Sequence, residues 1–171
     1  MILDDDKLVA FWGPQDKNGI FSQWYESDMI IRGDRYFCCE QWMMYRKAIL
    51  FQDYEIADKI LKSRNPREIK ALGRKVKNFN QAIWDENKEN IVFEGNYEKF
   101  TQSSYLYGSL MNTVGKIIVE ASPYDRIWGI GLSMQDDRIY DTSKWQGKNL
   151  LGNAIMEVRS SLIQDLRDQV E

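Results

Sequence analysis

The chain has 171 residues and a mass of 20.2 kDa, and 43% of its positions are hydrophobic and 29% charged. This composition is typical of one globular domain and excludes a fibrous or disordered protein. The 23 Lys and Arg residues against 26 Asp and Glu give a formal charge of −3, which excludes a global basic field that holds nucleic acid indiscriminately.

Histidine is absent from the sequence. Ser-His-Asp and Cys-His nucleophile pairs, His-based zinc sites and imidazole acid/base catalysis are therefore excluded, and catalysis is left to carboxylates, lysine or aromatic groups. The only cysteines, Cys38 and Cys39, are adjacent. This spacing favours two small buried hydrophobes and a reducing, cytoplasmic setting. The acidic N-terminus and the lack of an apolar run of about 20 residues predict neither secretion nor membrane insertion.

The first forty residues predict a small antiparallel sheet. Three β-like runs, Leu8–Trp12, Met29–Ile31 and Arg35–Cys38, are separated by turn signals such as Gly33-Asp34. A helical pattern begins at Glu40 and continues to Leu50.

Helical signals then dominate the chain. Apolar residues from Tyr54 to Leu61 have amphipathic spacing, and Asn65, Pro66 and Glu68 form a capping-box-like start for a helix that Gly73 ends. Asn80 is expected to cap a further helix, which Gly95 interrupts or bends.

The last third of the chain predicts helical segments to Met111, a buried strand at Ile117–Ala121, a glycine-rich loop at Ser122–Gly152 and a final amphipathic helix from Leu150. We therefore expect an α+β fold, a predominantly helical single domain with a small antiparallel sheet. Its predicted extent is residues 1–171.

Several residues are candidates for chemistry. Glu40 begins a helix, where the helix dipole favours a carboxylate, and Lys47 lies on the same face about 10 Å further along. Asp125 lies in the loop that follows a strand, where catalytic groups are common. Trp84 is a core residue by composition, although stacking on a planar base is an alternative for it. Two glycines after Trp128 permit close backbone approach to a ligand.

These segments together resemble the NADAR family, also called YbiA-like. The resemblance rests on Glu40-Gln41-Trp42 with Lys47, on Gly73-Arg74 and Trp84, and on the two loop motifs Ser122–Gly131 and Gly147–Gly152, in one order from about Phe11 to Leu166. The stretch Phe21–Trp24 resembles the family's Leu-Ser-Asn-Phe element, with Gln23 in the place of Asn, and Gln41 stands where the family often has His.

The resemblance implies an enzyme, an N-glycosidase that cleaves the bond between a ribose anomeric carbon and a nitrogen. The main expected activity is removal of ADP-ribose from ADP-ribosylated guanine in nucleic acid or nucleotides. The alternatives are cleavage of phosphorylated ribosylamino-pyrimidine riboflavin intermediates and a non-catalytic ADP-ribose or NAD-binding module. Neither a metal nor another cofactor is expected, and the oligomeric state is left open.

The resemblance also assigns candidate roles. The catalytic candidates are Glu40, Lys47, Trp84 and Asp125. The substrate-binding candidates are Ser22, Gln23, Arg74, Trp128, Gly129, Lys148 and Asn149. Two carboxylates can stabilise the positive charge that develops on the ribose and manage the protons, whereas an uncharged Lys47 can form a Schiff base with the opened sugar. A basic segment from Lys59 to Lys77 either follows a nucleic-acid backbone or is a solvated helical surface.

Overall fold

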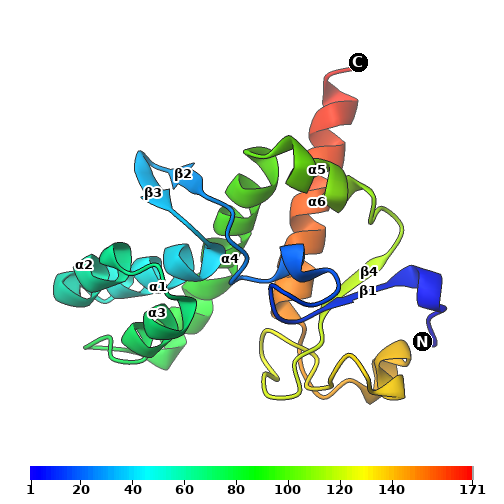
Figure 1. Ribbon diagram of the computed structural model, residues 1–171, viewed down its shortest axis with the longest axis horizontal. Helices are drawn as coiled ribbons and strands as arrows, with labels where there is room; N and C mark the ends of the chain where they lie inside the picture. The colour runs from blue at the N-terminus through cyan, green and yellow to red at the C-terminus, as the bar shows by residue number, and fades with distance from the viewer. Residues whose placement is uncertain (171) are drawn as a thin grey trace. The chain divides into compact units, whose positions relative to one another are not determined.

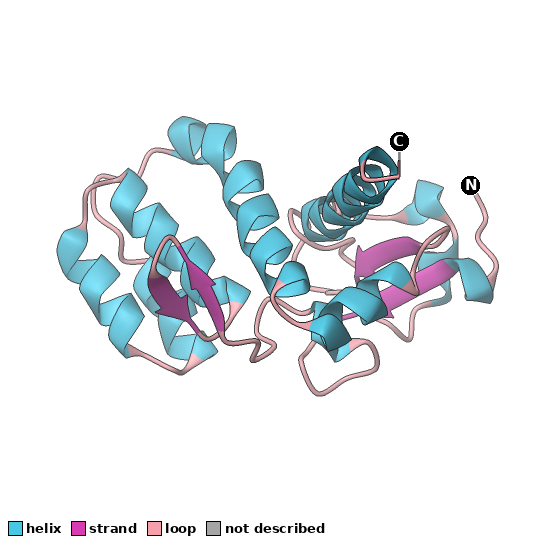
Figure 2. Cartoon of the chain, turned by 90° about the horizontal axis from the view of Figure 1, so that it is seen from above, coloured by secondary structure: helices cyan, strands magenta, loops and turns pink. Residues whose placement is uncertain are grey.

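The computed structural model describes residues 1–170 and divides the chain into two compact units. Unit 1 combines Met1–Ser22 with the segment from Ser103 onward, and unit 2 is Gln23–Gln102. The last residue of the expected domain, Glu171, lies outside the described residues. The α+β class is confirmed, with α-helices in the majority and the strands in two separate pairs (Figure 1, Figure 2).

The helices and strands of unit 2 follow the predicted order. A hairpin precedes four helices, and its turn residues Arg32 and Gly33 have φ values of 53° and 89°, as a tight two-residue turn requires. The elements are β2 (Met29–Ile31), β3 (Asp34–Tyr36), α1 (Cys39–Leu50), α2 (Tyr54–Lys62), α3 (Pro66–Gly73) and α4 (Gln81–Thr101). Helix α1 packs against α2, α3 and α4 (Figure 1).

The predicted helix caps are present, with one difference. The Asn65 side chain accepts hydrogen bonds from the backbone N–H groups of Arg67 and Glu68, and Asn80 caps α4 in the same way. The reciprocal half of the capping box passes through Ser63, because the Asn65 N–H donates to the Ser63 hydroxyl and that hydroxyl donates to the Glu68 carboxylate. The helix therefore starts where the pattern indicated.

The prediction that Gly95 interrupts its helix is wrong, since α4 runs unbroken from Gln81 to Thr101. A Cβ atom at Gly95 would lie 2.5 Å from Cδ1 of the buried Trp42. The glycine thus lets the indole of α1 pack directly on the α4 backbone, and the indole Nε1 donates to the Ile91 carbonyl at 2.9 Å. Close packing explains this residue.

The first β-like run also differs from the prediction. In unit 1, β1 (Leu8–Phe11) pairs in parallel with β4 (Ile117–Glu120), Leu8 opposite Ile117, and does not join the antiparallel hairpin. The remaining elements of unit 1 are α5 (Ser104–Met111), α6 (Leu150–Asp168) and four short 3-10 helices: η1 (Asp5–Lys7), η2 (Gly19–Phe21), η3 (Asp137–Tyr140) and η4 (Thr142–Lys144).

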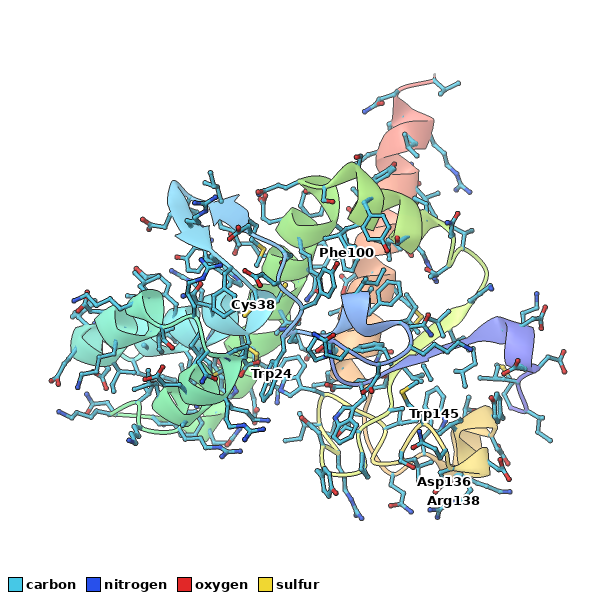
Figure 3. The ribbon with its side chains drawn as sticks, viewed as in Figure 1. Trp24, Cys38, Phe100, Asp136, Arg138 and Trp145 are labelled. Carbon is cyan, nitrogen blue, oxygen red and sulfur yellow. The ribbon has the colours of Figure 1, made fainter. Side chains whose placement is uncertain are left out.

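Helix α6 and the long loop complete the core of unit 1. The helix packs on β4, and Gly152 meets the Ile118 carbonyl so closely that no side chain fits between them. A hydrophobic cluster links β4 to the loop through Val119, Ala121, Ile130, Leu132 and Ile139. Figure 3 labels three residues of this loop, Asp136, Arg138 and Trp145; the first two form an ion pair at 2.7 Å, and the Trp145 indole donates to the Ile139 carbonyl.

No helix within residues 1–170 combines the length and the hydropathy needed to cross a lipid bilayer.

The contact between Trp42 and Gly95 makes a stability prediction. Intrinsic helix propensity alone favours Gly95→Ala by about 0.5–1 kcal/mol, but the new methyl group would overlap a rigid indole ring. We expect Gly95→Ala to lower the free energy of unfolding by roughly 1–3 kcal/mol, the usual cost of overpacking. Chemical denaturation measures this change.

Gly108→Ala is the matched control, because Gly108 also lies in a helix and a Cβ atom there meets no atom within 4 Å. We expect it to be neutral or mildly stabilising. A stabilised Gly95→Ala protein would contradict the packing explanation.

Candidate active site

Helix α1 places the first two catalytic candidates. Glu40 lies in the first turn and Lys47 in the last, on a helix whose residues are mostly buried. The Glu40 side chain is 7% exposed, and its backbone N–H donates to the Gln23 carbonyl at 2.9 Å. A carboxylate in the first helical turn is stabilised by the helix dipole, so this position suits a buried carboxyl group.

Lys47 is held by α3 and by two aromatic rings. Its ammonium Nζ donates to the Gly73 carbonyl at 2.8 Å and lies 4.6 Å from the centroid of the Phe79 ring and 5.6 Å from that of Trp84. A side chain in place of Gly73 would overlap the Met44 sulfur, so the Met44 side chain would have to move. The ammonium is thus oriented by one acceptor and two π-faces.

The charge state of Lys47 reflects three influences. Burial lowers the pKa of Lys47, the carboxylate of Glu40 acts in the opposite direction, and the guanidinium of Arg74 lowers the pKa further. A lowered pKa increases the uncharged fraction of the amine at a given pH, and the uncharged form is the nucleophile. The structure therefore brings Glu40, Lys47, Arg74 and Trp84 into one electrostatic and aromatic neighbourhood in unit 2.

Trp84 is 7% exposed, so the composition-based expectation of a core tryptophan is confirmed. Its ring also faces the Lys47 ammonium, which gives the residue a place in the candidate site without requiring an exposed stacking surface. Arg74 lies on the surface after α3, with its backbone N–H donating to the Lys70 carbonyl.

Gln23 belongs to a short chain of contacts that supports Glu40. The fully buried Asn96 of α4 donates from Nδ2 to Gln23 Oε1 at 3.0 Å and to the Val92 carbonyl at 2.9 Å. The Gln23 carbonyl in turn accepts the Glu40 N–H. Gln23 thus connects α4 with the start of α1, while its role in binding substrate stays a prediction.

The side chain of Gln41 connects the start of α1 with the end of α2. Its amide oxygen accepts the Phe37 N–H, and its amide nitrogen donates to the carbonyls of Ile60 and Ser63 at 3.1 and 2.9 Å. The side chain therefore donates to carbonyl groups at and just after the end of α2, where the helical hydrogen-bond pattern ends.

The remaining candidates lie in unit 1. Asp125 Oδ1 accepts the backbone N–H groups of Ile127 and Trp128 at 2.9 and 2.8 Å, so this carboxylate also shapes its own loop. Gly129 is buried against backbone oxygens of Glu120 and Asp125, which leaves no room for a Cβ.

Ser22, Lys148 and Asn149 differ in how accessible their side chains are. Ser22 is buried, and its backbone N–H donates to the Gly19 carbonyl. The side chain of Asn149 is buried against β4, donating to the Ile118 carbonyl at 2.9 Å and accepting the Glu120 N–H at 3.1 Å. Lys148 is exposed. In this structure Asn149 fixes the loop to β4, and ligand contacts of all three residues stay predictions.

The expectation that both cysteines are buried is confirmed. Cys38 and Cys39 are both free and buried, and burial raises the pKa of Cys38 to about 12 and that of Cys39 to about 11. Both are therefore protonated at neutral pH and poor nucleophiles. Figure 3 labels Cys38 at the start of α1.

Sequence reasoning missed Phe79, the Gly73 carbonyl and Asn96. Phe79 carried a signal: it precedes the Asn80 cap, and Trp84 is the fourth residue of the helix, which is the spacing of a hydrophobic staple. The Gly73 carbonyl and Asn96 carried none, because a backbone acceptor and a buried amide depend on how helices pack.

Within residues 1–170 the structure is thus a predominantly helical α+β protein with a buried carboxylate and a desolvated lysine beside aromatic rings. The NADAR domain family model matches residues 10–163, and the chain belongs to this family. The match extends through segments of both units.

Individual relatives have informative names. "N-glycosidase R617" of Acanthamoeba polyphaga mimivirus is 44% identical over 165 residues, covering 92% of this chain and 97% of the relative. The chloroplastic riboflavin biosynthesis protein PYRR of Zea mays is 26% identical over 171 residues, which cover 93% of this chain but 26% of that protein. The NMR structure of the E. coli protein YbiA matches with a TM-score of 0.77 at 25% identity, covering 96% of this chain and 90% of YbiA.

The environment of Lys47 predicts two opposite titration shifts. Glu40→Gln removes a negative neighbour and should lower the pKa of Lys47, whereas Arg74→Gln removes a positive neighbour and should raise it. NMR titration of ¹³Cε-labelled lysine, with Lys47→Arg to assign the signal, measures both shifts.

Arg67→Gln, which changes an exposed residue of the same helix α3, is the control and should leave the titration midpoint unchanged. Shifts of the same sign in the Glu40 and Arg74 variants would disprove the proposed electrostatic environment.

Proposed function

We propose that this protein is an N-glycosidase that removes ADP-ribose from ADP-ribosylated guanine in nucleic acid or nucleotides. The chain is a hydrolase of N-glycosyl bonds, in agreement with the names of its relatives. The observation that carries the proposal is the presence, on the single helix α1, of a buried carboxylate and a lysine with a lowered pKa. Both groups suit chemistry at an anomeric carbon.

One route is direct hydrolysis. Breaking the bond between the ribose anomeric carbon and nitrogen develops positive charge on that carbon and on the ring oxygen, which a buried Glu40 carboxylate stabilises. Water then adds to the anomeric carbon, and the departing nitrogen takes up a proton. Asp125, in unit 1, is the second carboxylate proposed for these proton transfers.

The second route uses Lys47 as a covalent nucleophile, and we favour it. The ring C–O bond of the ribose opens, leaving an imine between the anomeric carbon and the guanine nitrogen. The uncharged Lys47 amine attacks this carbon, the guanine amine leaves with a proton, and a Schiff base between Lys47 and the opened sugar remains. Water hydrolyses it to the aldehyde, which closes again to ribose, and the lysine is regenerated.

The guanidinium of Arg74 lowers the pKa of Lys47, and we propose that Arg74 contacts a phosphate of the substrate. A cytoplasmic setting fits two free thiols.

A specific observation keeps a second substrate in consideration. The Zea mays relative is named as a riboflavin biosynthesis protein, so cleavage of a phosphorylated ribosylamino-pyrimidine is the alternative activity. A binding module without turnover is the alternative outside the enzyme class. The same reaction measurement separates all three.

The decisive experiment is mass-spectrometric detection of free ADP-ribose after mixing the protein with an oligonucleotide ADP-ribosylated on guanine. Wild type should release ADP-ribose, and Glu40→Gln should be slower by roughly 100-fold or more, because charge is removed at nearly constant shape. Binding should be largely retained. No release by a folded wild-type protein would exclude this substrate and direct the test to ribosylamino-pyrimidines.

Asp125→Asn is informative in the same assay. Asparagine keeps the Oδ1 acceptor for Ile127 and Trp128, so the loop should persist while the charge is lost. Slower release of ADP-ribose with an unchanged free energy of unfolding supports a chemical role for Asp125. An unchanged rate of release would show that Asp125 only shapes its loop.

The Schiff-base route predicts a covalent adduct. Borohydride added during turnover should deliver hydride to the anomeric carbon and fix an ADP-ribosyl mass on the peptide that contains Lys47. Peptide mass spectrometry locates this adduct. The control variant is Lys88→Arg, which changes a lysine of α4. An adduct that persists in Lys47→Ala would show that another group is the nucleophile.

A further inference from the structure

The basic segment from Lys59 to Lys77 divides into two halves in the structure. The half on and after α2 is neutralised by neighbouring carboxylates. Lys59 pairs with Glu55 at 2.9 Å and Lys62 with Asp58 at 2.6 Å, each one helical turn apart. Arg64 pairs with Glu26 at 2.7 Å. This half is an ordinary solvated surface in which charges are matched.

The half on α3 is different. Arg67 and Lys70 of α3 and Arg74, the C-cap residue with helical dihedrals, are exposed. Their spacing of three and four residues puts them on one side of the helix. We call them the α3 basic stripe. Ile69 and Gly73 are buried and form the opposite face.

The stripe is not neutralised by the protein. None of its three side chains makes an ion pair with any residue in the described range 1–170. Glu68 is the only carboxylate between residues 66 and 77, and it accepts a hydrogen bond from the Ser63 hydroxyl. In a chain with a net charge of −3, this is a local positive surface that can attract an anionic partner.

The C-terminal end of the stripe meets the candidate active site. The Gly73 carbonyl, directly before Arg74, holds the Lys47 ammonium, and the charge of Arg74 affects the pKa of Lys47. Phe79, whose ring lies 4.6 Å from that ammonium, is 43% exposed. An exposed aromatic ring at the end of a basic track is the combination that binds unpaired nucleic acid.

We propose that the α3 basic stripe docks the phosphate backbone of single-stranded nucleic acid and that Phe79 stacks an unpaired base beside Lys47. This inference rests on the proposed function and deepens it, because the substrate is then a polymer and not a nucleotide alone. The stripe spans about 10 Å at 1.5 Å per residue, which suits contacts to a few successive phosphates. A single strand fits because its bases expose their π-faces for stacking.

Binding of an unmodified oligonucleotide tests the surface apart from catalysis. The probe is a fluorescein-labelled dT12 strand, followed by fluorescence anisotropy from 20 to 200 mM salt. The double variant Arg67→Gln/Lys70→Gln should weaken binding about tenfold and reduce the slope of log K against log salt by about 1.4, since each lost phosphate contact contributes about 0.7. Both substitutions are at exposed helical positions and use a good helix former.

Lys59→Gln/Lys62→Gln is the matched control, because it removes the same two charges from the neutralised half. It should bind within about twofold of wild type with an unchanged salt slope. An equal loss in the two double variants, or no loss in either, would overturn the proposal. Equal affinity for a dA12·dT12 duplex would overturn the assignment to single strands.

Turnover separates this proposal from the proposed function. With modified oligonucleotide the stripe variant should have a raised KM, and with ADP-ribosylated guanosine monophosphate its rate should equal that of wild type. Strong dT12 binding without ADP-ribose release from either substrate would contradict the proposed function and still support the α3 basic stripe as a nucleic-acid-binding surface. If both substrates release ADP-ribose and the stripe variant has the same KM as wild type, the proposed binding surface is contradicted and the proposed function is supported.

Discussion

The contact between Trp42 and Gly95 is the constraint on which the rest of unit 2 depends. Helix α1 is buried on most sides, so no solvent-facing stripe fixes its rotation about its own axis. The indole of Trp42 does so, because it packs on the bare α4 backbone and donates to the Ile91 carbonyl. Tyr36 closes over the same ring at a centroid distance of 5.2 Å. With the rotation fixed, the positions of Glu40 and Lys47 at the two ends of α1 follow.

The same tight packing shapes the environment of Lys47 in the candidate site. Met44 lies between Glu40 and Lys47 on the α1 face, and its sulfur occupies the space left by Gly73. The absence of a side chain on Gly73 brings the end of α3 close enough for its carbonyl to reach the Lys47 ammonium. Desolvation then lowers the pKa of the lysine, and the opposing effects of Glu40 and Arg74 give it a tunable charge. The residues that determine how α1 and α3 pack therefore also determine the environment of Lys47.

Local signals predicted most of the elements, and packing explains the failures. Asn65, Asn80 and the Pro66 start are decided within a few residues, so their helices were placed correctly. The pairing of Leu8 with Ile117 is not local and left no signal in either strand. In the sequence, a glycine that breaks a helix and a glycine that permits a close contact look the same. At Gly95, only the position of the Trp42 ring distinguishes the two. In the candidate site, Glu40, Lys47 and Trp84 were singled out from their places in the predicted helices, and the resemblance added their predicted catalytic roles. Their partner groups depend on tertiary structure.

The discontinuous make-up of unit 1 has a consequence for how the chain folds during synthesis. Strand β1 needs β4, whose first residue follows Leu8 by 109 positions (117 minus 8), and unit 2 lies wholly between them. At about 5–20 residues per second, a ribosome takes roughly 5–20 s to cover this distance. During that interval strand β1 has no partner strand, while the chain of unit 2 is completed. Vectorial synthesis thus completes the chain of unit 2 before that of unit 1, and Leu8–Phe11 has no partner strand until β4 has been made.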